Sequence, residues 1–175
     1  MAEVIIDGRY VPAGPWAADK IKSQVQHLKA SFRTGERHEE RAMFGPEGDV
    51  ADQAAARARL AAAIGPRVVF HRLILAPGPR YELQRVADLQ HWTRLVLADL
   101  GRELGLHLTW VAAVHRNTDH PHVHVLVAGA AVRAQWPRKG ATAGVHLFRG
   151  HYTFLSERAD SRARELWEDN TYETA

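Results

Sequence analysis

Two stretches near the middle of the chain decide the fold: TWVAAVH at residues 109–115 and HVHVLVA at residues 122–128. Both are short and apolar, and both are rich in β-branched residues, which is typical of strands. The residues between them, 116–121, are few enough for a hairpin connection. The two stretches therefore predict an antiparallel β-hairpin.

Histidines cluster on this hairpin. Side chains alternate between the faces of a strand, so His122 and His124 share one face and the intervening valine points to the other. His115 ends the preceding strand and can approach the pair across the hairpin. Three imidazoles on adjacent strands predict an open metal site, because neutral nitrogen ligands suit Mn²⁺, Zn²⁺, Ni²⁺ or Co²⁺ better than Ca²⁺. Asp119 is a candidate to orient one ring, whereas His120 is out of phase and is interpreted as a loop residue. The alternative is a set of surface histidines on an exposed strand face.

The rest of the chain predicts one domain around this hairpin. Apolar spacing predicts helices at 16–32, 51–64, 81–104 and 151–169, and strands at 3–6, 68–75 and 145–148. This order predicts an α+β fold: a two-layer sandwich with a central antiparallel sheet that carries the histidine hairpin, with helices packed on it. Residues 1–169 are expected to form the domain, and residues 170–175 a polar tail or linker.

Composition excludes several other chemistries. The chain has 175 residues and no cysteine, which excludes disulfide scaffolds, thiolate metal sites and cysteine nucleophiles. No apolar run approaches the roughly 18 residues of a membrane span. The N-terminal residues MAEVIIDGRY lack the signature of a signal peptide. A bacterial cytoplasmic location is therefore expected, with no membrane segment.

Positive charge is concentrated after the hairpin. Residues 129–151 contain no Asp or Glu, and aromatic side chains are interleaved with the basic ones. Single-stranded nucleic acid is bound by this combination, since cations neutralise phosphates and rings stack on bases. A second acid-free basic stretch surrounds position 72. The candidate DNA contacts are Arg72, Arg133, Trp136, Arg138, Lys139 and Arg149, and the alternative interpretation is a solvated loop.

The run VAAVHRNTDHPHVHVLVAG at 111–129 resembles the third motif of plasmid-mobilization relaxases, the nicking enzymes of conjugative DNA transfer. The similarity extends to LADLG at 97–101 and LTWVA at 108–112, which resemble the helix and strand before that motif. HLK at 27–29 and MFGPEGD at 43–49 resemble the N-terminal region of the family, and residues 151–166 resemble its closing helix. The resemblance covers most of the chain, and the histidine motif is its specific part.

The resemblance implies an activity and a site. His115, His122 and His124 would bind one divalent metal, Mn²⁺ or Mg²⁺ in the first place, with Zn²⁺, Ni²⁺ and Co²⁺ as alternatives. The metal would hold the scissile phosphate of single-stranded DNA at a transfer origin, where a tyrosine attacks and leaves a 5′-phosphotyrosyl link. The implied partners are that DNA and other relaxosome or conjugation proteins.

The sequence departs from the family at the nucleophile. The expected tyrosine directly follows the segment at 27–29, and that position is Ala30. Three explanations are open: a deliberate replacement, a natural relative that does not nick, or attack by another group, for which Tyr10 is the candidate. Two alternative functions accompany them: a non-catalytic single-stranded DNA-binding accessory factor that retains the metal, and a small metallohydrolase that uses activated water.

Overall fold

The computed structural model describes residues 4–29, 41–116 and 120–173. A six-stranded sheet has the order β1-β4-β7-β6-β2-β3, and its neighbouring strands are antiparallel. Its strands are β1 Ile5–Pro12, β2 Met43–Phe44, β3 Asp49–Val50, β4 Val68–Ala76, β6 Trp110–His115 and β7 His122–Ala128. A smaller sheet contains β5 Leu106–His107, β8 Ala130–Arg133 and β9 Thr142–Gly144.

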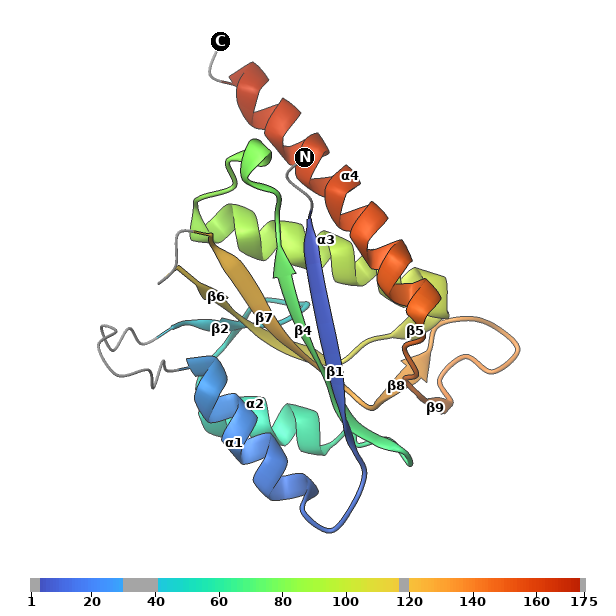
Figure 1. Cartoon of the computed structure of the whole chain (residues 1–175). Coiled ribbons are helices and arrows are strands. Elements are labelled where there is room, and N and C mark those ends of the chain that lie inside the picture. Colours follow the sequence, from blue (N-terminus) through green and yellow to red (C-terminus); the bar gives the residue numbers. More distant parts are fainter. Residues whose placement is uncertain (1–3, 30–40, 117–119, 174–175) are drawn as a thin grey trace.

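Four α-helices in the described part of the chain pack on the large sheet (Figure 1). They are α1 Ala17–Lys29, α2 Gln53–Ala61, α3 Val86–Leu104 and α4 Arg149–Glu173, and a short 3₁₀ turn, η1, spans Pro79–Tyr81. None of the described helices is both long and apolar enough to cross a membrane.

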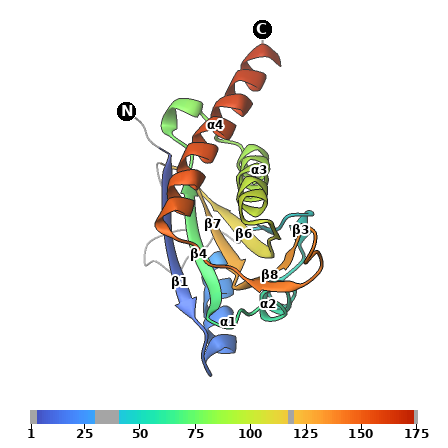
Figure 2. The ribbon, with the colours of Figure 1, turned by 90° about the vertical axis from the view of Figure 1, so that its right-hand side faces the viewer.

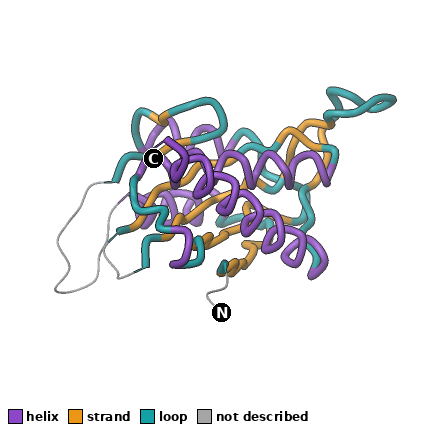
Figure 3. Tube along the Cα trace, turned by 90° about the horizontal axis from the view of Figure 1, so that it is seen from above, coloured by secondary structure: helices purple, strands orange, loops and turns teal. Residues whose placement is uncertain are grey.

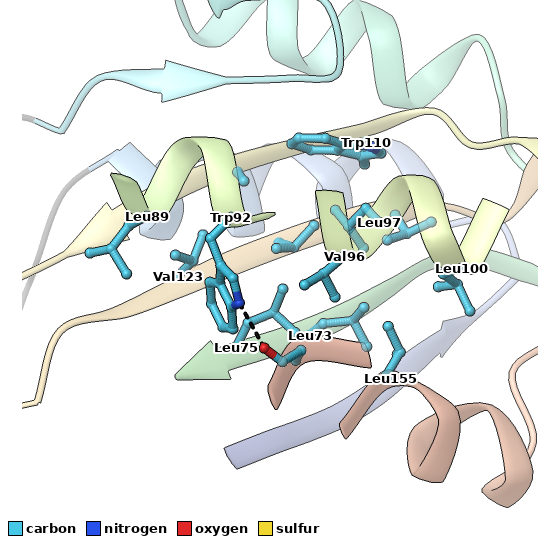
Figure 4. Close-up of a cluster of buried hydrophobic side chains, with 14 of the residues drawn as sticks. Leu73, Leu75, Leu89, Trp92, Val96, Leu97, Leu100, Trp110, Val123 and Leu155 are labelled. Atoms are coloured by element: carbon cyan, nitrogen blue, oxygen red, sulfur yellow. Dashed lines mark hydrogen bonds between the residues drawn. The ribbon is translucent and has the colours of Figure 1, made fainter. Parts of the chain in front are cut away.

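One face of the sheet packs against α3 and α4, which lie side by side (Figure 2). Alternate residues of the central strands face this way, among them Leu73 and Val123 (Figure 4). Trp92 of α3 is fully buried there, and its indole N–H donates a 2.9 Å hydrogen bond to the carbonyl of Ala159 in α4. This bond fixes the two helices to each other as well as to the sheet.

The other face packs against α1 and α2. Val111 and Leu126, which are out of phase with the first set, face this second core. The helices contribute Ile21, Val25, Leu28, Ala56 and Leu60. The predicted α+β class with an antiparallel sheet that carries the histidine hairpin is therefore confirmed. Because helices cover both faces, the sandwich has helix, sheet and helix layers where two layers were expected.

A buried carboxylate joins α3 to α4. Asp99 is 4% exposed and accepts hydrogen bonds from Arg158 at 3.1 Å and from Arg162 at 2.9 Å, with Arg102 as a third partner. Burial works to raise the pKa of Asp99, but the arginine contacts outweigh it and hold that pKa below its usual value. The network places α4 firmly over the sheet.

Two glycines allow a close crossing of the chain where β7 ends beside the start of β4. A Cβ atom at Gly129 would lie 1.7 Å from the carbonyl oxygen of Val68, and one at Gly65 would lie 2.1 Å from the carbonyl oxygen of Gly129. Only residues without a side chain fit at this distance. The crossing sets where β7 ends and the smaller sheet begins.

The structure corrects several predicted boundaries. β1 continues through Gly8 to Pro12, and two short strands lie in the segment 43–50, where no strand was predicted. Residues 145–148 are not a strand, because β9 ends at Gly144. α4 extends to Glu173, four residues beyond the helix end predicted at 169.

Candidate metal centre

Three histidines meet at the end of the β6–β7 hairpin. His115 and His122 are directly paired across the strands, and His124 pairs with Ala113, so all three side chains lie on the sheet face that α1 covers. One ring nitrogen from each lies within 4.8 Å of the others. The ring centroids are 4.0 Å apart for His115 and His124, 5.0 Å for His122 and His124, and 5.4 Å for His115 and His122. The predicted convergence of these residues is confirmed.

Hydrogen bonds orient two of the rings. His115 is 8% exposed and hydrogen-bonds the backbone of Leu28 near the end of α1. Its Nε2 atom is buried and has no hydrogen-bond partner among the described residues. The Nδ1 atom of His122 lies 3.0 Å from the carbonyl oxygen of His120. With Nδ1 donating to that carbonyl, the Nε2 lone pair of His122 is left for a ligand.

Burial keeps two of the three rings, His115 and His124, unprotonated. Burial, the neighbouring imidazoles and the positive charge of Arg41 lower the pKa of His115 to about 2. Burial, His122, Arg72 and Arg41 lower the pKa of His124 to about 4. A metal ligand must be an unprotonated imidazole, so both rings are in the binding form across the physiological range.

The residues present fit a divalent metal. An orphaned, buried Nε2 atom is costly unless an ion or water satisfies it, and three convergent imidazoles are a common catalytic ligand set. Three ligands leave positions open for water or a substrate oxygen. No Asp or Glu among the described residues joins the group, so the described ligands do not neutralise the charge of the ion.

Two arginines flank the histidines on the same face of the sheet. Arg72 of β4 pairs with Leu126, one ladder step diagonally from His124. Arg41 lies two residues before β2, whose Met43 pairs with Ala113 of β6, and its charge acts on both His115 and His124. The effect of both arginines on the histidine pKa values supports this proximity.

Arg72 was a predicted DNA contact, and the structure brings it to the site. Arg41 is 6% exposed, and sequence reasoning missed it. It lies far from the hairpin in the chain, and only strand pairing brings it near. No local signal in the sequence marks it.

The structure does not bring Tyr10 to the histidines. Tyr10 pairs with His71 in the β1–β4 ladder, and their ring centroids are 6.4 Å apart. That position faces the opposite side of the sheet from His124, since Arg72 and not His71 shares the histidine face. Ala30 and Asp119 lie outside the described residues.

The basic and aromatic loop also lies away from the site. β7 runs from His122 to Ala128, a length of about 20 Å, and the loop between β8 and β9 begins beyond its far end. Figures 1 and 3 show this loop projecting on the right, away from the start of β7. Trp136 is 86% exposed in it. Arg133, Arg138, Lys139 and Arg149 lie in or near this loop, and Arg72 does not.

Comparisons with known proteins give one informative match. No protein-family model matches the chain, and no curated protein sequence matches it. The chain is similar to a solved structure from work on the molecular basis of vancomycin resistance transfer in Staphylococcus aureus. The TM-score is 0.56 at 13% sequence identity, over 97% of this chain and 94% of the other. At this identity the match shows a shared fold over nearly the whole of both chains.

Proposed function

We propose that the chain is a relaxase-like domain that binds a divalent metal at His115, His122 and His124 and holds a phosphodiester of single-stranded DNA at a transfer origin. The observation that carries the proposal is the convergence of three imidazoles at the end of the β6–β7 hairpin, where burial keeps His115 and His124 unprotonated. The solved structure with the same fold comes from work on vancomycin resistance transfer, and this supports a proposed role in DNA transfer.

The chain's own residues would prepare the site in three ways. The backbone of Leu28 and the carbonyl of His120 hold two of the rings in place. Burial keeps His115 and His124 unprotonated. Arg72 supplies positive charge on the same face, where a phosphate would be attracted. A bound metal would stabilise the negative charge that develops on phosphate oxygens during transesterification.

Nicking requires a nucleophile, and the tyrosines with described side chains do not supply one. Tyr10 and Tyr152 lie on the α4 side of the sheet, where Tyr152 packs over Gly8. Tyr81 is buried and hydrogen-bonded to Asp160. This observation favours a second candidate function, a DNA-binding accessory factor that uses the metal without cutting.

Metal binding is the first test. Calorimetric titration with Mn²⁺ should show one site per chain, and His122→Ala should lose it, whereas the exposed His91→Ala in α3 should bind as the natural chain does. Fluorescence anisotropy with a random-sequence single-stranded DNA pool should then show binding that weakens at least about tenfold with a chelator. Failure of the natural chain to bind Mn²⁺, Mg²⁺ or Zn²⁺ would overturn the proposal.

Covalent chemistry separates the two candidate functions. Oligonucleotides recovered from the pool by binding are incubated with the protein and analysed on a denaturing gel. An adduct with the natural chain shows nicking and eliminates the accessory-factor function. Position 30 directly follows Lys29 at the end of α1. An adduct that forms only with Ala30→Tyr assigns this position as the place of the nucleophile. DNA binding without an adduct in either protein supports the accessory factor.

A further inference from the structure

The histidine site lies in a row of positive charge that crosses the sheet. Arg72 is diagonal to His124 on the histidine face of β4 and β7, and Arg41, two residues before β2, is close enough for its charge to act on His115 and His124. The row continues onto the edge strand, where Arg9 is the direct partner of Arg72 in the β1–β4 ladder. Partners in a ladder share a face of the sheet, so these side chains project from the same surface.

The positive charge beside the three histidines bears on which ligands the site prefers. Sites for hard cations such as Ca²⁺ and Mg²⁺ gather carboxylates, which attract the ion and neutralise it. Here the ligands are imidazoles, no described Asp or Glu joins them, and the described side chains of Arg72 and Arg41 bring positive charge close to the rings. An ion bound by the histidines would be repelled by Arg72, while a phosphate beside it would be attracted by both.

We propose that Arg72, supported by Arg41, determines the ligand specificity of this site by weakening its affinity for metal alone and strengthening its affinity for a phosphodiester, so that metal and single-stranded DNA are bound as a pair. This inference rests on the proposed function, since it needs a metal at the histidines. In this inference Arg72 lowers the affinity of the site for the metal alone and raises its affinity for the phosphodiester.

The opposite signs make the proposal testable. Arg72→Gln should tighten Mn²⁺ binding in the absence of DNA by about threefold, as expected for one unit charge acting on a divalent ion through solvated protein. The same change should weaken binding of (dT)8, measured with Mn²⁺ present, by about tenfold, since a charge-assisted contact is lost. A residue that merely supports the strand would lower both affinities when changed.

Matched variants separate charge from packing. Arg72→Lys keeps the charge and should bind Mn²⁺ as the natural chain does. Arg9→Gln removes the same charge one strand further away and should tighten Mn²⁺ binding less than Arg72→Gln. Arg138→Gln, in the distant β8–β9 loop, should leave Mn²⁺ affinity unchanged. All variants are compared at one ionic strength, with thermal unfolding to show that each is folded.

Linkage gives an independent check on the natural chain. If metal and DNA bind as a pair, Mn²⁺ raises the affinity for (dT)8, and (dT)8 raises the affinity for Mn²⁺ by the same factor, after subtraction of Mn²⁺ binding to the free oligonucleotide. Equal metal affinities with and without DNA, or an Arg72→Gln variant that weakens both ligands or neither, would refute the inference while the proposed function stands. Absence of any Mn²⁺ binding that depends on His122 would instead refute the proposed function.

Discussion

The neutral histidines should make the metal-free protein sensitive to mild acid. His115 has a pKa of about 2 in the folded chain, against 6.5 for a free imidazole. The folded pKa is depressed, so the stability contributed by the neutral ring is complete above pH 6.5 and is lost as the pH falls toward 2. Below pH 6.5 the unfolded chain binds a proton that the folded chain excludes, and unfolding becomes more favourable.

The size of this effect follows from the linkage relation. A fully depressed imidazole removes at most about 1.4 kcal/mol of stability for each pH unit. Between pH 6.5 and 5.0, where the unfolded ring passes from half to nearly full protonation, the loss from His115 is about 1.5 kcal/mol. His124 acts in the same direction down to about pH 4, with a smaller total effect because its pKa of about 4 is less depressed than that of His115.

Urea unfolding with a chelator present measures the effect. The natural chain and His115→Gln are compared at pH 6.5 and pH 5.0, and the variant should lose about 1.5 kcal/mol less between the two pH values. Asp99 and other carboxylates contribute equally to both proteins and cancel. His91→Gln, at an exposed position of α3, should behave as the natural chain. Parallel losses in the natural chain and His115→Gln would show that His115 is not held neutral by the fold.

Two further substitutions test the packing that positions the hairpin. Gly129→Ala should destabilise the protein by at least about 3 kcal/mol, because its Cβ would meet the Val68 carbonyl oxygen; thermal unfolding checks this, and Gly150→Ala, where a Cβ contacts nothing, should cost no stability. Trp92→Phe should lose about 1–3 kcal/mol in urea unfolding, since the buried carbonyl of Ala159 loses its donor. An unchanged midpoint for either variant would contradict the packing described.

The histidine site was largely predictable because it is local in the sequence. H-x6-H-x-H on two strands joined by a short turn must converge once the strands pair, since the period of a strand puts alternate residues on one face. His115, His122 and His124 are confirmed as neighbours for that reason. The same local periodicity correctly places Val123 on the opposite face of the strand, where it packs in the core with α3 and α4.

The charged surroundings were not predictable in the same way. Position 41 is 74 residues from His115 along the chain, and the pairing of the nearby β2 with β6 brings the two segments together. The loop with Trp136 follows the hairpin closely in sequence, yet it lies at the opposite end of β7 from the histidines. The two ends of this extended strand are about 20 Å apart. Sequence proximity to the histidine motif therefore gave the wrong neighbourhood for that loop.

The sequence by itself determined the hairpin, the shared face of its histidines, the α+β class and the absence of cysteine ligands, because each depends on local periodicity or on composition. Only the tertiary structure decided that helices cover both faces of the sheet, that Arg41 and Arg72 flank the site, and that Tyr10 faces away from it. These features depend on strand order and register between distant segments. Long-range pairing is set by the packing of the whole core, and no local pattern encodes it.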